Sequence, residues 1–250
     1  MIPIKFILTF GIFFCLHFTN VYSQSDNQFD AEVELSQLLN GQYVKSLEKI
    51  KWTPYTKENV QTSEDGFAYT TVDSVITYKT NNEEYRLVVF RTNIMHEGME
   101  EQCAGCAPTL GLALFKIIEG KPTLTSLNRS VLNVGQAGML PDYSIVELSA
   151  ESKGLLVKEG NFQDSDVYCF LYSLDETNVS NLVFEFPHFR MLNYDKGKHQ
   201  TSTLTILNND QEANYILQLE TNTFVSEKKL SSKKVNYIFN GRRWEPIESK

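Results

Sequence analysis

Two cysteines three positions apart, Cys103 and Cys106, are the side chains of this sequence with the clearest chemical potential. They are followed directly by Ala107-Pro108 and then by an apolar run. Two thiols at this spacing can form a small disulfide, exchange electrons with another dithiol, or bind a soft metal ion. The surrounding sequence and the cellular compartment decide between these three kinds of chemistry.

A metal site at this pair needs further ligands close by. Tetrahedral zinc sites take four ligands, and the sequence lacks the second Cys or His pair that would complete one. The nearest additional candidate is His96, and several glutamates lie in the same segment, Glu100 and Glu101 among them. Cys103, Cys106 and His96 are therefore the candidate metal ligands, in an incomplete set.

A redox function of the pair is less well supported than a structural one. Thioredoxin-like pairs begin a helix that follows a strand, where the helix N-terminus lowers the thiol pKa. Here Pro108 follows closely and no strand–helix–strand pattern surrounds the pair. We therefore predict a Cys103–Cys106 disulfide that stiffens its loop, although so short a loop removes little entropy from the unfolded chain. A metal site, a redox pair and two inert thiols remain the alternatives.

Residues 1–23 have the pattern of a secretory signal peptide. Lys5 supplies the positive start, the segment from Phe6 to Phe18 is almost wholly apolar, and small Ser23 precedes the expected cleavage site. The apolar segment is shorter than the roughly 20 residues of a membrane-spanning helix. We expect an exported chain, periplasmic or extracellular, that has no transmembrane segment once the signal is removed.

The composition narrows the expected partners. The formal net charge is −8, from 23 Lys and Arg against 31 Asp and Glu. One of the basic residues, Lys5, belongs to the signal segment, so the acidic excess lies in the rest of the chain. An acidic surface repels phosphate groups, so we expect neither nucleic acid nor an anionic membrane surface as a partner. Outside the signal segment the cysteines are Cys103, Cys106 and Cys169, which fits one disulfide and one remaining thiol in an oxidising compartment.

The segment 24–41 predicts one short helix at the start of the mature chain. Apolar residues such as Val33 and Leu38 recur at helical spacing, Asp26 or Asp30 can cap the helix start, and Gly41 stands where a helix ends.

After Gly41 the sequence predicts strands. Apolar and β-branched residues alternate or form short runs between turn residues, which is the pattern of β-structure. The expected strands are 67–72, 74–78, 85–91, 112–118, 123–127, 145–148, 154–159, 167–174, 182–186, 203–207, 215–220, 235–239 and 242–247. A short helix at 110–115 is the alternative for one of these runs.

Three turn signals organise these strands into hairpins. They are the polar segment 81–84, the segment 119–122 and Asn240-Gly241, and the last is a strong signal for a two-residue hairpin turn. Many short strands at regular spacing without strand–helix alternation predict a mainly β fold. We expect an antiparallel sandwich or barrel-like single domain from 24 to 250, with the short N-terminal helix.

Taken together, these motifs resemble a group of exported bacterial proteins of unknown activity. The resemblance is carried by Cys103-x-x-Cys106-Ala107-Pro108, by the loop at Gly135 and by the closing hairpin with Trp244. In that group a His follows the first Cys, whereas this chain has Ala104, so a metal ligand of the group would be missing here. The resemblance implies export and a β architecture and implies no activity.

Motifs of known catalytic chemistry are absent from the sequence. It contains no Gly-x-Ser-x-Gly, no His-Glu-x-x-His and no phosphate-binding loop, and His188 and His199 are expected as surface histidines in polar loops. We therefore predict no catalytic residues and no cofactor. The function favoured by the sequence is a non-enzymatic exported module that binds an unknown ligand or an envelope protein. A thiol-dependent metal-binding or disulfide-exchange protein is the alternative, and a hydrolase using paired carboxylates is a weaker one.

Overall fold

The computed structural model describes residues 29–55, 58–101, 103, 106–159, 166–193, 195–207, 215–239 and 243–247. The predicted signal peptide lies outside these ranges. Within them, the structure contains no helix with the length and apolar character that a membrane crossing requires.

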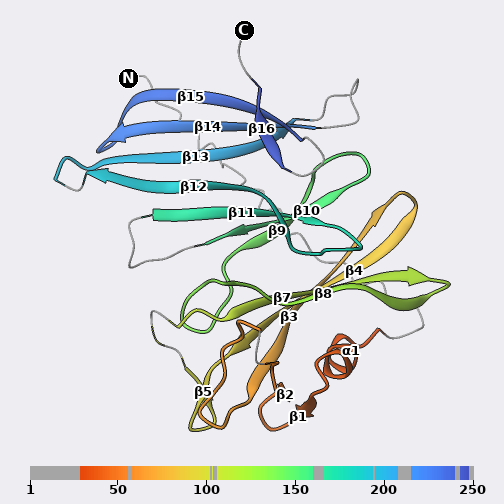
Figure 1. The fold of residues 1–250 in the computed structure, drawn as a ribbon. Coiled ribbons are helices and arrows are strands. Elements are labelled where there is room, and N and C mark those ends of the chain that lie inside the picture. The colour runs from red at the N-terminus through yellow and green to blue at the C-terminus, as the bar shows by residue number, and fades with distance from the viewer. Residues whose placement is uncertain are drawn as a thin grey trace, which may run out of the picture.

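One short helix and a long series of strands make up the described chain (Figure 1). In chain order the elements are α1 (Ala31–Leu38), β1 (Gln42–Val44), β2 (Lys49–Trp52), β3 (Ala68–Thr80), β4 (Glu83–Asn93), β5 (Met95–His96), β6 (Met99–Glu100), β7 (Thr109–Ile118), β8 (Lys121–Asn133), β9 (Tyr143–Glu147), β10 (Lys153–Lys158), β11 (Asp166–Leu174), β12 (Asn181–Asn193), β13 (Lys198–Leu207), β14 (Ile216–Val225), β15 (Lys228–Phe239) and β16 (Trp244–Pro246).

These strands form two large antiparallel sheets and one small hairpin. The N-terminal sheet has the order β1-β2-β3-β4-β7-β8, the C-terminal sheet runs from β16 back to β9, and β5 pairs with β6. Neighbouring strands are nearly always consecutive in the sequence, so hairpins build both sheets. The prediction of a mainly β, antiparallel single domain with a short N-terminal helix is confirmed.

Helix α1 is capped at its start by Asp30 and ends at Leu38, with Leu39 as its C-cap. The carboxylate of Asp30 accepts hydrogen bonds from the backbone N–H groups of Glu32 and Val33, which is the capping arrangement expected of Asp. At the other end Asn40, not Gly41, adopts the left-handed conformation, with φ of 50°. Gly41 serves close packing instead, because an added Cβ would lie 2.8 Å from a methyl carbon of Ile50.

The hairpins follow the predicted turns, and two of the predicted strands form a single strand. Asn81-Asn82 and Glu119-Gly120 have positive φ at both positions, as in type I′ turns. The strands predicted at 67–72 and 74–78 are one strand, β3, interrupted by a bulge at Asp73. β7 is a strand throughout, which excludes the alternative helix at 110–115. β15 and β16 pair as expected, and Asn240-Gly241 between them lies outside the described residues.

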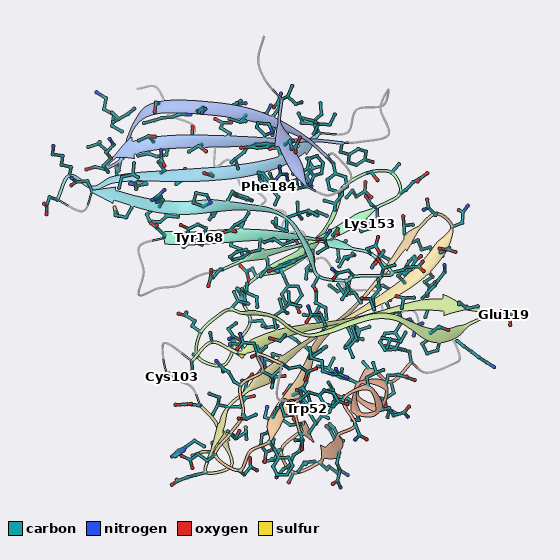
Figure 2. The ribbon with its side chains drawn as sticks, viewed as in Figure 1. Trp52, Cys103, Glu119, Lys153, Tyr168 and Phe184 are labelled. Atoms are coloured by element: carbon teal, nitrogen blue, oxygen red, sulfur yellow. A yellow bond between two sulfur atoms is a disulfide. The ribbon has the colours of Figure 1, made fainter. Side chains whose placement is uncertain are left out.

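The described residues form three apolar cores, and the first lies between α1 and one face of the N-terminal sheet. Alternate residues of β4 and β7 point to this face, Val88 and Phe90 from one strand and Ala113 and Phe115 from the other. Trp52, labelled in Figure 2, belongs to the same core. Gly111 allows Phe90 to lie flat here, because a Cβ at this position would be 2.0 Å from the Phe90 ring.

The second core lies between the two sheets. The other alternate residues of the same strands, such as Leu87 and Leu112, pack against Leu155, Val157 and Tyr172 of the C-terminal sheet. β4 and β7 are thus covered on both faces, which accounts for their continuous apolar sequences.

The third core arises because the C-terminal sheet divides into two leaves. β12 pairs with β13 only between Phe189 and Asn193, so the earlier half of β12 separates from the later half of β13. We call β9, β10, β11 and residues 181–188 of β12 the inner leaf, and β13–β16 the outer leaf. Figure 1 shows the outer leaf at the top, the inner leaf below it, then the N-terminal sheet and α1. Side chains of both leaves fill the third core, among them Leu148, Leu171, Val183, Phe184, Leu204, Leu217 and Trp244.

Candidate functional site

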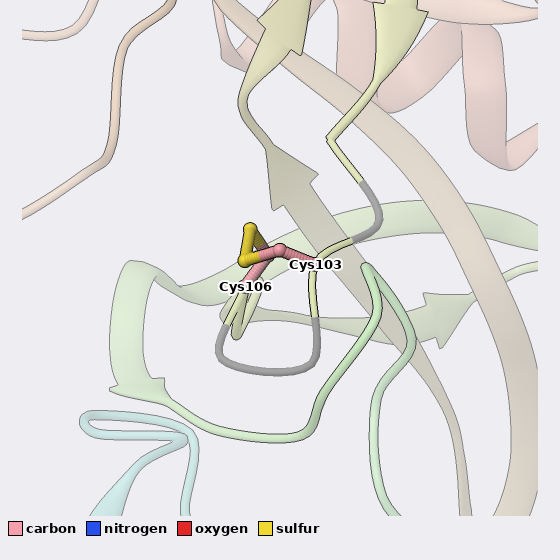
Figure 3. The surroundings of a disulfide bond; sticks show 2 residues. All are labelled: Cys103 and Cys106. Carbon is pink, nitrogen blue, oxygen red and sulfur yellow. A yellow bond between two sulfur atoms is a disulfide. The ribbon is translucent and has the colours of Figure 1, made fainter.

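The cysteine loop, residues 103–108, holds the predicted pair at bonding distance. The two Sγ atoms of Cys103 and Cys106 are 2.06 Å apart, and the backbone N–H of Cys106 donates a hydrogen bond to the carbonyl of Cys103 at 3.0 Å (Figure 3). The pair closes a tight turn between β6 and β7.

A second loop fixes this turn. The backbone N–H groups of Ala137 and Gly138 donate hydrogen bonds to the carbonyls of Cys103 (3.2 Å) and Cys106 (3.0 Å). Gly135, with φ of 103°, permits the bend, because a Cβ there would be 2.1 Å from the carbonyl oxygen of Met139. Two motifs about thirty residues apart in the sequence are therefore parts of one structural unit.

The group of possible metal ligands at this loop differs from the expected one. Ligand atoms of Glu101, Cys103 and Cys106 all lie within 4.8 Å of one another. His96 does not belong to this group, and its Nδ1 atom lies 3.5 Å from a carboxylate oxygen of Glu64. The carboxylate of Glu100 forms an ion pair with Lys49 in a half-buried position. Glu101 therefore takes the place that sequence spacing assigned to His96.

A cavity of about 300 Å³ opens where the two leaves diverge, and we call it the wedge cavity. Apolar walls come from Leu156 and Phe186 of the inner leaf and Leu204 of the outer leaf. Its volume is at the lower end of the range for small-molecule sites, about 300–1,000 Å³. The complete lining is Asp142, Tyr143, Ser144, Leu156, Lys158, Cys169, Phe186, His188, Thr203 and Leu204.

Cys169 lies in the wall of the wedge cavity as a buried free thiol. Burial raises its pKa to about 11, although the positive charge of Lys158 acts in the opposite direction. At neutral pH the side chain is therefore a protonated, weakly polar thiol. A catalytic cysteine requires a lowered pKa, so this environment favours a packing or ligand-contact role.

His188 is also part of the cavity wall and lies on β12, not in the polar loop that the sequence predicted. Its Nδ1 atom is 2.9 Å from the backbone carbonyl of Ser202, so the Nδ1–H donates this bond. Burial lowers the pKa of His188, and the charge of Lys158 adds to the effect. The ring is thus neutral near pH 7 and offers Nε2 as an acceptor.

His199 likewise lies on a strand, β13, where the sequence predicted a polar loop. Its ring stacks between those of Phe189 and Phe224, with centroid distances of 5.4 and 5.2 Å. This aromatic packing accounts for a histidine at position 199 without any catalytic role.

The N-terminal sheet anchors the rim of the wedge cavity. The hydroxyl of Tyr143 hydrogen-bonds to the carboxylate of Asp73, the bulge residue of β3, and lies 2.7 Å from the hydroxyl of Ser74. Asp73 in turn forms an ion pair with Arg91 at 3.4 Å. These contacts tie Tyr143, and with it the start of β9 beside the cavity, to the N-terminal sheet.

Comparison with protein-family models, curated proteins and solved structures finds no match for this chain. The assignment of a site therefore depends on the geometry of the molecule itself. By that criterion we consider two candidates within the described part of the chain, the wedge cavity and the cysteine loop.

The sequence contained no signal for the wedge cavity. Its lining comes from strands β9 to β13 and from Asp142 just before β9, and the cavity opens where pairing between β12 and β13 stops. The sequence did show Cys169 within a run of aromatic residues, but nothing in that pattern indicates that one face of the strand borders a cavity.

Proposed function

We propose that this protein is an exported, non-enzymatic binding module that holds a compact, mainly apolar small molecule in the wedge cavity. The observation that carries the proposal is the cavity of about 300 Å³ between the two leaves. The chemistry of its wall supports binding over catalysis, because the thiol of Cys169 has a raised pKa. Export is supported by the sequence of residues 1–23.

The wall indicates what kind of molecule fits. Leu156, Phe186 and Leu204 would contact an apolar body, since burial of apolar surface stabilises a complex by roughly 25 cal/mol per Å². The neutral His188 ring offers its Nε2 atom as an acceptor to one polar group of the ligand. An alcohol with an alkyl chain of moderate length combines these properties.

A titration of the mature chain with 1-octanol tests the proposal. Chemical shifts of the methyl groups of Leu156 and Leu204 are followed by NMR, and saturable changes confined to the cavity wall are expected. The Leu204→Trp variant fills the cavity and should lose these changes.

Leu230→Trp is the matched control, because Leu230 is 53% exposed on β15 of the outer leaf. Circular dichroism verifies that both variants are folded. If 1-octanol causes no saturable shifts, or if Leu204→Trp binds it as well as the unsubstituted chain does, the wedge cavity is not the binding site.

A further inference from the structure

Next to the loop that holds the cysteines, the Oδ1 atom of Asn93 is a buried hydrogen-bond acceptor that has no donor among the described residues. Asn93 is 3% exposed, and its Nδ2 group donates a hydrogen bond to the carbonyl of Gly138 at 2.9 Å. Its Oδ1 atom has no hydrogen-bond partner in the described part of the chain. An unsatisfied buried polar atom costs about 1–3 kcal/mol, so such an atom calls for a partner.

A small space adjoins Asn93. Asn93, Glu101 and Cys106 line a cavity of about 10 Å³, together with Gln61 and the backbone around Gly138. This volume is close to that of one water molecule or a single ion. The orphan acceptor and two of the three possible metal ligands thus border the same space.

The ligand-bearing residues are held by backbone hydrogen bonds from separate segments. Glu101 donates its N–H to the carbonyl of Ile94 at 3.0 Å, and the cysteine loop is fixed by Ala137 and Gly138. We expect such external contacts to preserve the backbone positions of Glu101 and the two cysteines when the disulfide is opened. Preorganised ligands reduce the entropic cost of binding.

We propose that reduction of the Cys103–Cys106 disulfide creates a site for one soft divalent cation of the Zn²⁺ type. The ligands are the two cysteine thiolates and the Glu101 carboxylate, and a water molecule completes the tetrahedron. This water donates a hydrogen bond to the Oδ1 atom of Asn93. Two thiolates, one carboxylate and an open position match the donors that Zn²⁺ prefers.

A dithiol can act as the reductant that opens the disulfide. One dithiol transfers two electrons and two protons to the Cys103–Cys106 bond, so two thiols form and the reductant becomes a disulfide. Binding of the cation then releases the two thiol protons to solvent. Zn–S bonds of about 2.3 Å place tetrahedral sulfur atoms about 3.8 Å apart, which requires only a small opening of the turn.

Cobalt(II) is the probe for the test, because thiolate-bound cobalt absorbs in the near ultraviolet. The mature chain carrying Cys169→Ser is reduced with a phosphine and titrated with Co²⁺ without oxygen. We expect a thiolate–cobalt band that saturates at one ion per chain and disappears when Zn²⁺ is added. The oxidised protein should show no such band.

Variants identify the ligands. Glu101→Gln should weaken Co²⁺ binding at least about tenfold. Substitution of residues that merely support a metal ligand already lowers metal affinity by about this factor. His96→Ala is the matched control and should bind Co²⁺ unchanged. Circular dichroism of each reduced variant verifies the fold before titration.

Three results would overturn the proposal. The first is a reduced protein whose Co²⁺ titration equals that of the Cys103→Ser, Cys106→Ser double variant. The second is a thiolate–cobalt band that Glu101→Gln leaves unchanged, and the third is a band that His96→Ala abolishes. The 1-octanol experiment is independent of both, so this site and the proposed function stand or fall separately.

Discussion

The inner layers of this molecule, which are the N-terminal sheet and the inner leaf, differ from the outer leaf in how deeply their strands are buried. β7 is buried on both faces from Thr109 to Phe115, whereas β15 is exposed from Lys228 to Lys234. The outer leaf contacts the third core at one end only, and its other end contributes almost no buried side chain. The difference predicts that stability is concentrated in the N-terminal sheet and the inner leaf, while the outer leaf closes the wedge cavity.

Charge follows the same division. Residues 24–189 contain 24 acidic and 12 basic side chains, whereas residues 190–250 contain 7 acidic and 10 basic ones. Lys198 and Lys228 lie at neighbouring hairpin ends of the outer leaf. The net charge of the whole chain therefore conceals a basic outer leaf, and the expected repulsion of anionic partners applies to the acidic part alone.

The largest expected effect separates the two regions directly. Phe90→Ala removes a fully buried ring from the first core and should lower the free energy of unfolding by about 3–5 kcal/mol. Leu230→Ala on the outer leaf should change it by less than about 0.5 kcal/mol. Urea unfolding followed by circular dichroism measures both. Equal losses would show that the outer leaf is as important for stability as the inner layers.

The second-largest expected effect on stability concerns a chain of buried hydrogen bonds. Trp52 Nε1 donates to the hydroxyl of Thr70 at 2.8 Å, and this hydroxyl lies 2.7 Å from that of Thr92. Thr70→Val leaves both partners unsatisfied and should cost about 1–3 kcal/mol. The same substitution at exposed Thr205 is the control and should be nearly neutral. If the two variants unfold at the same urea concentration, this hydrogen-bond chain makes no net contribution to stability.

The smallest expected effect concerns pH. The hydrogen bond from Lys51 lowers the pKa of Asp65 from 3.8 to about 2, and Tyr69 contributes. A carboxylate with a lowered pKa stabilises the fold above its unfolded pKa, and this contribution is lost as pH falls from about 4 to 2. Asp65→Asn should therefore reduce the melting temperature at pH 6 and do so much less at pH 2.

On the outer leaf, Ser232 and Lys234 lower the pKa of Glu220 in the same direction. Glu220→Gln should show the same sign with a smaller difference between pH 6 and pH 2. A larger pH dependence for Glu220→Gln than for Asp65→Asn would reverse the ranking of the two regions.

Local sequence patterns predicted the elements of the fold well. The helix capped by Asp30, the hairpin turns at 81–82 and 119–120 and the strand character of β7 were all recoverable from residue type and spacing. The predictions that failed were local too. His188 and His199 were expected in loops because charged or turn-forming neighbours obscured the strands that contain them.

The sequence alone determined a mainly β architecture, because side-chain periodicity and turn chemistry act between near neighbours. It also singled out the cysteine pair. Only the tertiary structure decided that Glu101, not His96, lies beside that pair, and that the Gly135 loop holds it. The wedge cavity likewise depends on where pairing between β12 and β13 ends. Such features result from packing between strands distant in the chain, which no local pattern encodes.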